Sequence, residues 1–421
     1  MEARWDTSGT GDPKVPARAR QRHTFAAHVF SASVTGILLK QLRFIGESIG
    51  AFEIAALGCA LYFIASNSRR ALASDVYFVH FMLLQLGAFC CGAVVSLCFF
   101  PEHFSPREVA ATIYTSIIVL GWVFYTEGEF IDRVRLLRNY LAIYCAAVVL
   151  FATIAYPIAP WLWYFDVYLG RLMGLSDNPN QLAGLCVFGM AMSAIIVDGQ
   201  RGIRGADVGA GAAILIAGLM THSVTFALSI AVSALLALTV HVWSRDGAAH
   251  RFARQLFSFG IQLALLGGLL ILVLFGGQII DALVYLYQGG SAKGATRLGY
   301  WIAAMGEVAS SPIVGFGPGG HVRVENSPVL QEAHNVFVEL LLSGGIVSLA
   351  AFVMLLTVVL VASVRYRAPS VVFAVCALVI LGSFHTVLRH GYYWIALHAS
   401  MTALFLVSRR DLEASPSEES D

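Results

Sequence analysis

One long segment, residues 297–345, holds most of the residues in this chain that could do chemistry. It contains Arg297, a glycine-rich turn at residues 315–320, and the pair His334–Asn335 directly before an apolar run. An arginine can bind the oxygens of a phosphate through two parallel hydrogen bonds. A neutral histidine can accept a hydroxyl proton near neutral pH. The segment therefore holds a candidate anion ligand, Arg297, and a candidate general base, His334.

The pair His334–Asn335 also has a structural interpretation, because Asn335 is a suitable cap for the helix expected to follow it. A metal site is a further alternative, in which His334 would act with His321, Glu325 and Glu332. The spacing of these four residues matches no metal-binding motif, so we predict that the chain binds no metal. Catalysis and helix capping both stay open for the pair.

The glycine-rich turn at residues 315–320, GFGPGG, contains the spacing G-x-G that occurs in dinucleotide-binding folds. Such folds need a strand before the turn and a helix after it, and neither is expected here. Pro318 also lacks the backbone N–H group that a phosphate-binding helix start would offer. We therefore expect the glycines to allow a tight turn, packed closely against a substrate or a neighbouring helix.

The composition indicates a membrane protein. Of the 421 residues, 58% are hydrophobic and 13% are charged, whereas soluble domains carry about 25% charged residues. The formal net charge of +1 gives no support to nucleic-acid binding. All seven cysteines lie in apolar runs, so neither a disulfide framework nor a cysteine metal site is expected.

Apolar runs long enough to cross a bilayer recur along the chain. We predict an all-α, polytopic membrane protein of about twelve transmembrane helices. Nine spans fall within residues 24–276, a large loop covers 277–334, and three spans fall within 335–408. Residues 1–23 and 409–421 are expected to be tails, the first of them disordered. The expected spans are residues 24–39, 47–66, 76–100, 108–126, 140–158, 181–197, 208–222, 224–243, 257–276, 335–362, 370–386 and 392–407.

The distribution of basic residues orients these spans. With the N-terminus in the cytoplasm, every short basic loop and most of the 27 Lys and Arg residues fall on the cytoplasmic side. Both termini are then cytoplasmic, and residues 157–180, the loop 277–334 and the turn near Arg389 lie outside. A connection of about 58 residues between spans is unusually long, which is typical of a functional segment.

Four arginines lie in these outer segments: Arg171, Arg297, Arg323 and Arg389. Since outer loops are usually poor in arginine, one interpretation is that they bind substrate phosphates at the membrane surface. The alternative is that they only extend from span ends towards the lipid headgroups. Arg297 is the one that we favour as functional. It opens a short amphipathic helix, residues 297–305, in which Tyr300 and Trp301 suit a membrane interface.

Two further outer turns carry polar residues. Asn178 and Asn180 precede the sixth expected span, where their amides suit hydrogen bonds to sugar hydroxyls or the capping of the helix. The residues Thr221-His222-Ser223 occupy another outer turn and are further candidates for capping. Capping and substrate binding are compatible roles.

The residues of the long loop resemble the signature region of the O-antigen ligase and O-antigen polymerase superfamily. The match consists of residues 312–319 (PIVGFGPG), the pair His334–Asn335, and Glu339 leading into residues 344–346. Arg297 and Trp301 upstream, and the asparagine-rich residues 178–183, are similar to the same family's pattern. The motif region covers about fifty residues, and the rest of the chain is similar in topology only.

This resemblance implies an enzyme of the bacterial inner membrane. Members of the family move glycans from undecaprenyl diphosphate carriers to an acceptor hydroxyl at the periplasmic face, without a nucleotide sugar. The ligases use no metal, and we expect no cofactor here. By resemblance, Arg297 binds the diphosphate and His334 activates the acceptor hydroxyl in one inverting displacement. Further candidates for substrate contact are Arg171, Arg323, Arg389, Asn178, Asn180, Trp301 and Asn335.

The chain departs from the family pattern at one position. The family often has Thr-x-Ser-Arg at the turn represented here by residues 221–224, and this chain has Val224 in place of the arginine. Either His222 or another outer arginine supplies the missing phosphate contact, or the substrate contacts differ. Ligase and polymerase stay open as alternatives, because both use the same donor. The acceptor, whether lipid A core, a second lipid-linked glycan or a protein hydroxyl, leaves no motif in the sequence.

Two other classes of protein fit the composition. A transporter or flippase of lipid-linked or polar solutes would be expected to place charged residues deep in its spans and to contain discontinuous helices. Glu47 and Glu53 are the main acidic residues near a span interior, and the sequence shows no partner for either. A purely structural membrane protein would not need the arginines and histidine of the long loop. We therefore favour the glycosyltransferase.

Overall fold

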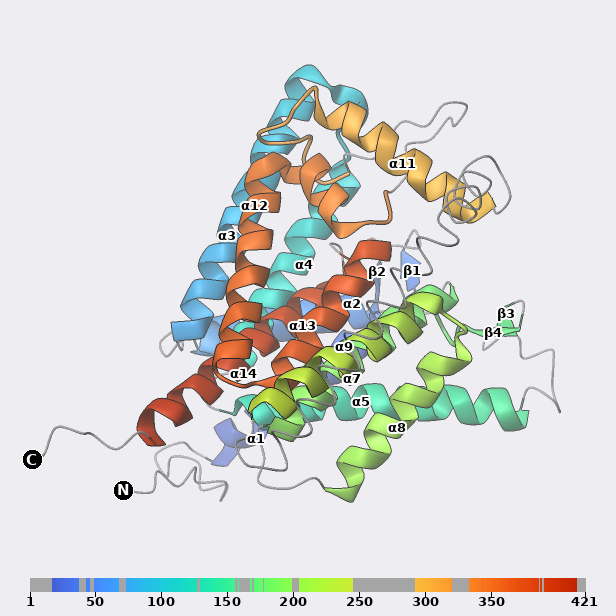
Figure 1. Cartoon of the computed structure of the whole chain (residues 1–421), viewed down its shortest axis with the longest axis vertical. Coiled ribbons are helices and arrows are strands. Elements are labelled where there is room, and N and C mark those ends of the chain that lie inside the picture. The colour runs from blue at the N-terminus through green and yellow to red at the C-terminus, as the bar shows by residue number, and fades with distance from the viewer. Residues whose placement is uncertain are drawn as a thin grey trace, which may run out of the picture.

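The computed structural model of this chain is built almost entirely from helices (Figure 1). It describes residues 17–37, 43–45, 49–67, 73–126, 129–155, 158, 167–168, 170–176, 178–198, 204–244, 292–319, 333–385, 387 and 390–414. Within these residues there are twelve α-helices and two short antiparallel hairpins. The ninth expected span, residues 257–276, lies outside the described residues.

The first half of the chain forms α1 (Ala17–Gly36), α2 (Ala51–Asn67), α3 (Ala73–Phe99), α4 (Pro106–Tyr125), α5 (Phe130–Leu150) and α7 (Pro179–Asp198). The second half forms α8 (Gly205–Met220), α9 (Val224–Ser244), α11 (Ala292–Val308), α12 (Val336–Arg365), α13 (Pro369–Phe384) and α14 (Gly391–Ala414). The strands, which the sequence analysis did not anticipate, are β1 (Arg43–Ile45), β2 (Ile49–Gly50), β3 (Val167–Tyr168) and β4 (Arg171–Leu172).

Six of these helices are long and apolar enough to cross a membrane, namely α3, α4, α5, α7, α9 and α12. Three shorter helices, α2, α8 and α13, are also apolar. The chain is therefore an all-α membrane protein with several candidate spans, as its composition predicts.

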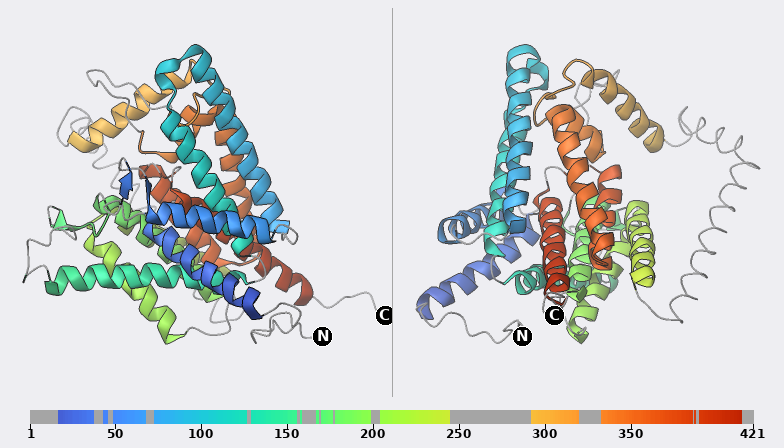
Figure 2. Two further views of the ribbon diagram at one scale, coloured as in Figure 1. Left: turned by 180° about the vertical axis from the view of Figure 1, so that it is seen from behind. Right: turned by 60° about the vertical axis from the view of Figure 1, so that its left-hand side comes forward.

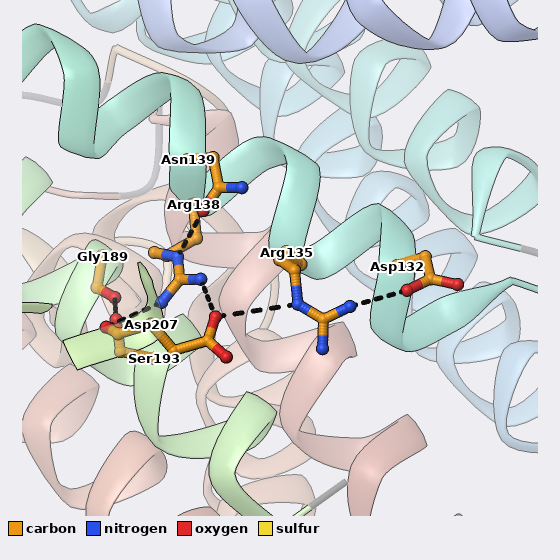
Figure 3. A network of polar contacts seen from close by, with 7 residues as sticks. All are labelled: Asp132, Arg135, Arg138, Asn139, Gly189, Ser193 and Asp207. Atoms are coloured by element: carbon orange, nitrogen blue, oxygen red, sulfur yellow. Dashed lines mark hydrogen bonds and ion pairs between the residues drawn. The ribbon is translucent and has the colours of Figure 1, made fainter. Parts of the chain in front are cut away.

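Helix α5 differs most from expectation. The sequence places the fifth span at residues 140–158, whereas α5 begins at Phe130 and takes in three arginines that we expected in a loop. Two of them, Arg135 and Arg138, converge on Asp207 of α8, as Figure 3 shows. Arg138 is 1% exposed and forms an ion pair with the Asp207 carboxylate. This pairing stabilises the arginines on the helix, so α5 continues through the basic stretch.

The outer ends of the first and last helices also reach further than expected. Helix α1 begins at Ala17, within the expected N-terminal tail, and α14 continues to Ala414, within the expected C-terminal tail. Both extensions are rich in alanine, arginine and other residues with high helix propensity, which explains why the helices continue.

Helix α13 lies at the centre of the bundle, where it packs against α7, α9, α12 and α14. Its residues Val371, Ala374 and Leu378 are buried completely. Helices at the periphery expose bulky apolar side chains instead, such as Met354 and Val358 of α12. Because lipid tails are as apolar as these side chains, such exposure is expected of a helix that faces a bilayer.

The helix ends fall into two groups. At one end of the bundle α3, α8 and α13 finish and α4, α9 and α14 begin. Helix α11 lies at this end and runs crosswise to α9 and α14 in Figure 1, beside the tops of α3 and α12 (Figure 2). We refer to it as the α11 end. Arg135 and Arg138, which contact Asp207, lie at the opposite end, where α5 and α8 begin.

Candidate functional site

Helix α12 is interrupted near its start. Gly345 has backbone angles of φ 62° and ψ −161°, which lie outside the helical region. It divides α12 into a first part, residues 336–344, and a second part, residues 346–365. Such a break leaves carbonyl groups of the first part and N–H groups of the second part without partners within the helix.

The backbone of residues 312–317 supplies these partners. The N–H group of Phe316 donates to the carbonyl of Leu342 at 2.6 Å. In the other direction, the N–H group of Ile346 donates to the carbonyl of Pro312 at 2.9 Å. Polar backbone groups within a membrane protein must be satisfied internally, so this exchange stabilises the interrupted helix.

The close approach of residues 312–317 to the backbones of α12 and α3 requires glycine at two positions. Gly315 and Gly317 have φ angles of 64° and 77°, which disfavour any other residue. A Cβ atom on Gly315 would lie 2.8 Å from the nitrogen of Gly344, and one on Gly317 would lie 2.8 Å from the Cβ atom of Ala93. Both distances are shorter than van der Waals contact. The prediction that the turn packs against a neighbouring helix is therefore confirmed, with α12 and α3 as the partners.

His334 directly precedes α12 and has a left-handed backbone with φ 52°. For a residue other than glycine this conformation costs roughly 1–2 kcal/mol, so its surroundings must hold it. Asn335 accepts the N–H group of Phe337 at 2.9 Å and thereby caps α12. Its amide nitrogen also donates to the carbonyl of Ser383 in α13 at 3.1 Å. The capping role predicted for Asn335 is confirmed.

Ala333, on the other side of His334, is held through both of its backbone groups. Its N–H group donates to Oε1 of Glu339 at 2.8 Å, and its carbonyl accepts the indole N–H of Trp301 at 2.7 Å. Ala333 is completely buried, and Glu339 is 4% exposed. Glu339 lies in the first turn of α12, where the helix dipole stabilises a carboxylate. Side chains of α11 and α12 thus fix the backbone next to His334.

Helix α11 docks on this region through one face. Its inward residues join a small hydrophobic cluster composed of Ala304, Val308, Phe316, Ala333 and Leu342. Trp301 lies at helical spacing from the first two and packs against the same cluster. Ile302 and Met305, beside this face, are exposed. We expected Trp301 to suit a membrane interface, but its N–H group is bonded inside the protein.

A contact that the sequence analysis missed holds the end of α11. Nε2 of His103, in the short 3₁₀ turn Pro101–His103, lies 3.5 Å from Oε2 of Glu307 in the last turn of α11. The His103 ring stacks on that of Phe316 with their centroids 4.4 Å apart. Because His103 lies about 200 positions before Glu307 and Phe316, no local pattern indicated the contact.

A second polar cluster forms where β4, α7 and the turn between α8 and α9 meet. Nε of Arg171 donates to the carbonyl of Thr221 at 2.8 Å, and Nη2 donates to the side-chain oxygen of Asn180 at 3.0 Å. Thr221 caps the C-terminus of α8. These bonds use two of the five N–H donors of the guanidinium group. Arg171 is therefore fixed in place by two elements that follow it in the chain.

The other polar residues of these turns cap helices. The side-chain oxygen of Asn178 accepts the N–H group of Gln181 at 3.1 Å, at the start of α7. The hydroxyl of Ser223 accepts the N–H group of Phe226 at 3.4 Å, at the start of α9. The capping roles that the sequence indicates for both turns are confirmed.

Both clusters lie at the α11 end of the bundle, on either side of the last turn of α13. Asn335 donates to Ser383 of this turn. Gly184, near the start of α7, faces the same turn, because a Cβ atom there would lie 3.8 Å from the side chain of Leu381. The fold thus brings the region of His334 and the region of Arg171 to one end of the protein.

Three arginine candidates are described in part or not at all. Arg323 and Arg389 lie outside the described residues. For Arg297 only the backbone is described, in α11, one helical turn before Trp301. Among the described residues, no group of three or more His, Cys, Asp or Glu side chains could hold a metal ion.

A buried polar network lies further from the α11 end. Nε2 of His398 in α14 lies 2.9 Å from Oδ1 of Asp75, in the first turn of α3. Trp122 of α4 donates its indole N–H to Nδ1 of His398 at 3.1 Å. Because an indole can only donate, Nδ1 accepts and the His398 proton lies on Nε2, facing Asp75. None of these three residues is among the candidates predicted from the sequence.

Comparison with known proteins adds no assignment. No protein-family model matches the chain, and no curated protein matches it.

Proposed function

We propose that this protein is a glycosyltransferase of the O-antigen ligase or O-antigen polymerase type. It moves a glycan from undecaprenyl diphosphate onto an acceptor hydroxyl of a glycan or of lipid A core. The proposal places the chain in the bacterial inner membrane as about twelve spans. Both termini are cytoplasmic, and the α11 end, with the large loop 277–334, faces the periplasm.

The observation that supports this function best is that a fixed arginine and a conformationally constrained histidine lie at one end of the bundle. Arg171 is held by two hydrogen bonds of 2.8 and 3.0 Å. His334 is held in a left-handed conformation between the capping residue Asn335 and the clamped residue Ala333. Transfer from a diphosphate requires an anion ligand and a proton acceptor, both fixed before the reaction.

Arg171 is our candidate for the phosphate contact that Val224 cannot make. Val224 opens α9 and is 81% exposed, and Arg171 donates to Thr221 in the same turn. A guanidinium group at this turn offers the charge that the family pattern places one residue after Ser223. His222, which is exposed in the turn, is the other candidate.

In the proposed step, the oxygen of the acceptor hydroxyl attacks the anomeric carbon of the donor. The bond between that carbon and the diphosphate oxygen breaks, and undecaprenyl diphosphate leaves with the electron pair. Arg297 and Arg171 stabilise its negative charge, while His334 accepts the hydroxyl proton. Attack opposite the leaving group inverts the anomeric configuration. Diphosphate leaves readily, so the pair of carboxylates found in glycosidases is unnecessary.

The interrupted helix α12 is a feature that a transporter would also have. In this protein, however, the hydrogen-bonding groups at the break are bonded to Pro312 and Phe316 of the same chain. Two buried carboxylates also have partners, since Glu53 accepts the N–H group of Gly50 and Asp75 contacts His398. Groups already bonded within the protein favour glycosyl transfer over solute transport.

The test is gel analysis of lipopolysaccharide and exopolysaccharide from a deletion strain, complemented with wild type or with His334→Ala. Loss of long chains from lipid A core, with lipid-linked polymer accumulating, indicates a ligase. Single repeat units alone indicate a polymerase. Normal glycans in the deletion strain would contradict both activities. We expect His334→Ala, made at wild-type levels, to fail to complement, and full complementation would remove the proposed role of His334.

A further inference from the structure

Two hydrogen bonds to Ala333 connect helix α11 and helix α12 to the backbone of His334. The carbonyl of Ala333, which forms the peptide bond to His334, accepts the indole N–H of Trp301 at 2.7 Å. The N–H group of Ala333 donates to the carboxylate of Glu339 at 2.8 Å. Both bonds are formed where water is largely excluded, because Ala333 is completely buried and Glu339 is 4% exposed. Such bonds are stronger than they would be in water.

The conformation of His334 requires such support. Its φ angle of 52° is unfavourable for a residue with a Cβ atom, and rotation about the preceding bonds would relieve the strain. The capping bond of Asn335 holds the residue that follows His334, and the bonds to Ala333 hold the peptide that precedes His334. With both neighbours fixed, the direction in which the imidazole leaves the backbone is fixed as well.

We propose that Trp301 and Glu339 are positioning residues, which set the imidazole of His334 by clamping the peptide of Ala333. This gives Trp301 a role other than substrate contact. It also connects the two halves of the proposed site, because Arg297 lies one turn before Trp301 on α11. The kinetic consequence rests on the proposed glycosyl transfer, whereas the clamp itself does not.

The kinetic test uses the purified full chain, an undecaprenyl-diphosphate-linked oligosaccharide and an acceptor glycan. Trp301→Phe keeps an aromatic ring but removes the N–H donor, and Glu339→Ala removes the acceptor. Both are expected to lower kcat about tenfold to hundredfold, the range for a misplaced catalytic group, with little change in KM for the donor. Glu339→Gln keeps an oxygen for Ala333 and is expected to restore most of kcat. A raised donor KM with unchanged kcat would instead mean that Trp301 contacts substrate, and would overturn the proposal.

A second measurement tests the clamp without any transfer activity. Diethyl pyrocarbonate modifies accessible histidines, and peptide mass spectrometry gives the rate at His334. We expect Trp301→Phe and Glu339→Ala to change this rate severalfold, with His80 as an internal reference because it is exposed on α3. Glu339→Gln should match wild type. If wild type shows no transfer but the rates shift as expected, the proposed function fails and the clamp stands. Unchanged rates at His334 in all variants would overturn the clamp.

Discussion

Arg171 and His334 owe their positions to their neighbours. Arg171 donates to one backbone carbonyl and one side-chain amide. His334 lies between the helix cap Asn335 and Ala333, whose backbone forms two hydrogen bonds with side chains. These bonds restrict the side chain of Arg171 and the backbone on either side of His334. This is the property that a group acting on a transition state requires, because little reorganisation remains for the moment of reaction.

At this scale, the proposed function predicts that Arg171→Lys is not a conservative change. A lysine has one ammonium group and cannot donate from two sides of a planar fork to Thr221 and Asn180. We expect the transfer rate of the purified protein to fall about tenfold or more. Complete loss of one preorganised donor costs about a hundredfold to a thousandfold, and a lysine keeps the positive charge. Thermal unfolding should change little, because the side chain is partly exposed.

Arg107→Lys is the matched control, since Arg107 is exposed at the start of α4 at the same end of the protein. Its rate should equal that of wild type. Equal rates for Arg171→Lys and Arg107→Lys would contradict the phosphate-binding role of Arg171.

Among the elements, the interrupted helix α12 and the turn at residues 312–317 form one unit. Residues 312–317 form hydrogen bonds with the backbone groups at the break in α12. The same bonds hold residues 312–317 against α3. The first part of α12 carries Glu339, and its cap is Asn335. The geometry around His334 therefore depends on an element that the turn holds together.

This unit predicts that Gly345→Ala destabilises the protein. The φ angle of 62° alone costs an alanine roughly 1–2 kcal/mol, and the added Cβ atom would collide with the carbonyl of Ile313. We expect a lower midpoint of thermal unfolding in detergent and reduced glycan transfer.

Gly87→Ala in α3 provides the comparison, because nothing lies within 4 Å of a Cβ atom at that position. It should leave the unfolding midpoint unchanged or raise it slightly, since alanine has the higher helix propensity. An unfolding midpoint for Gly345→Ala as high as that of Gly87→Ala would show that the break can be closed in another way.

Over the whole molecule, buried polar networks join helices that are distant in the chain. The contact between Arg138 and Asp207 joins α5 to α8 (Figure 3). The network of Asp75, Trp122 and His398 joins α3, α4 and α14. Polar bonds between helices add specificity where lipid provides no hydrophobic driving force for association.

The second network predicts a stability effect separate from catalysis. His398→Ala removes the acceptor of the Trp122 indole and one partner of the Asp75 carboxylate. Because all three residues are almost fully buried, each lost bond is expected to cost about 1–3 kcal/mol. The midpoint of thermal unfolding should fall, while the KM for the donor stays that of wild type in the folded fraction.

His80→Ala serves as the control for this change. His80 is exposed on α3 and contacts only the carbonyl of Val76 in its own helix among the bonds we describe. Its removal should leave the midpoint close to that of wild type. If His398→Ala unfolds at the wild-type temperature, the network contributes nothing measurable to stability.

The all-α class of the protein and the positions of most helices were predictable from local sequence patterns. Apolar runs predicted twelve helices, and eleven of these correspond to described helices, of which six are long and apolar enough to cross a membrane. The caps at Asn178 and Asn335 were also predictable. These features are local, because a helix, its hydrophobicity and its cap depend on residues within a few positions of one another.

The contacts that hold the candidate residues were not predictable, because they form only when the helices pack. The bond from Trp301 to Ala333, the bond from Arg171 to Thr221 and the filling of the break at Gly345 join residues far apart in the chain. The early start of α5 likewise depends on Asp207 in another helix. A sequence pattern reports which faces are apolar, but not which polar groups meet when the helices pack. These contacts depend on the packing of the whole bundle, because each buried polar group requires a hydrogen-bond partner within it.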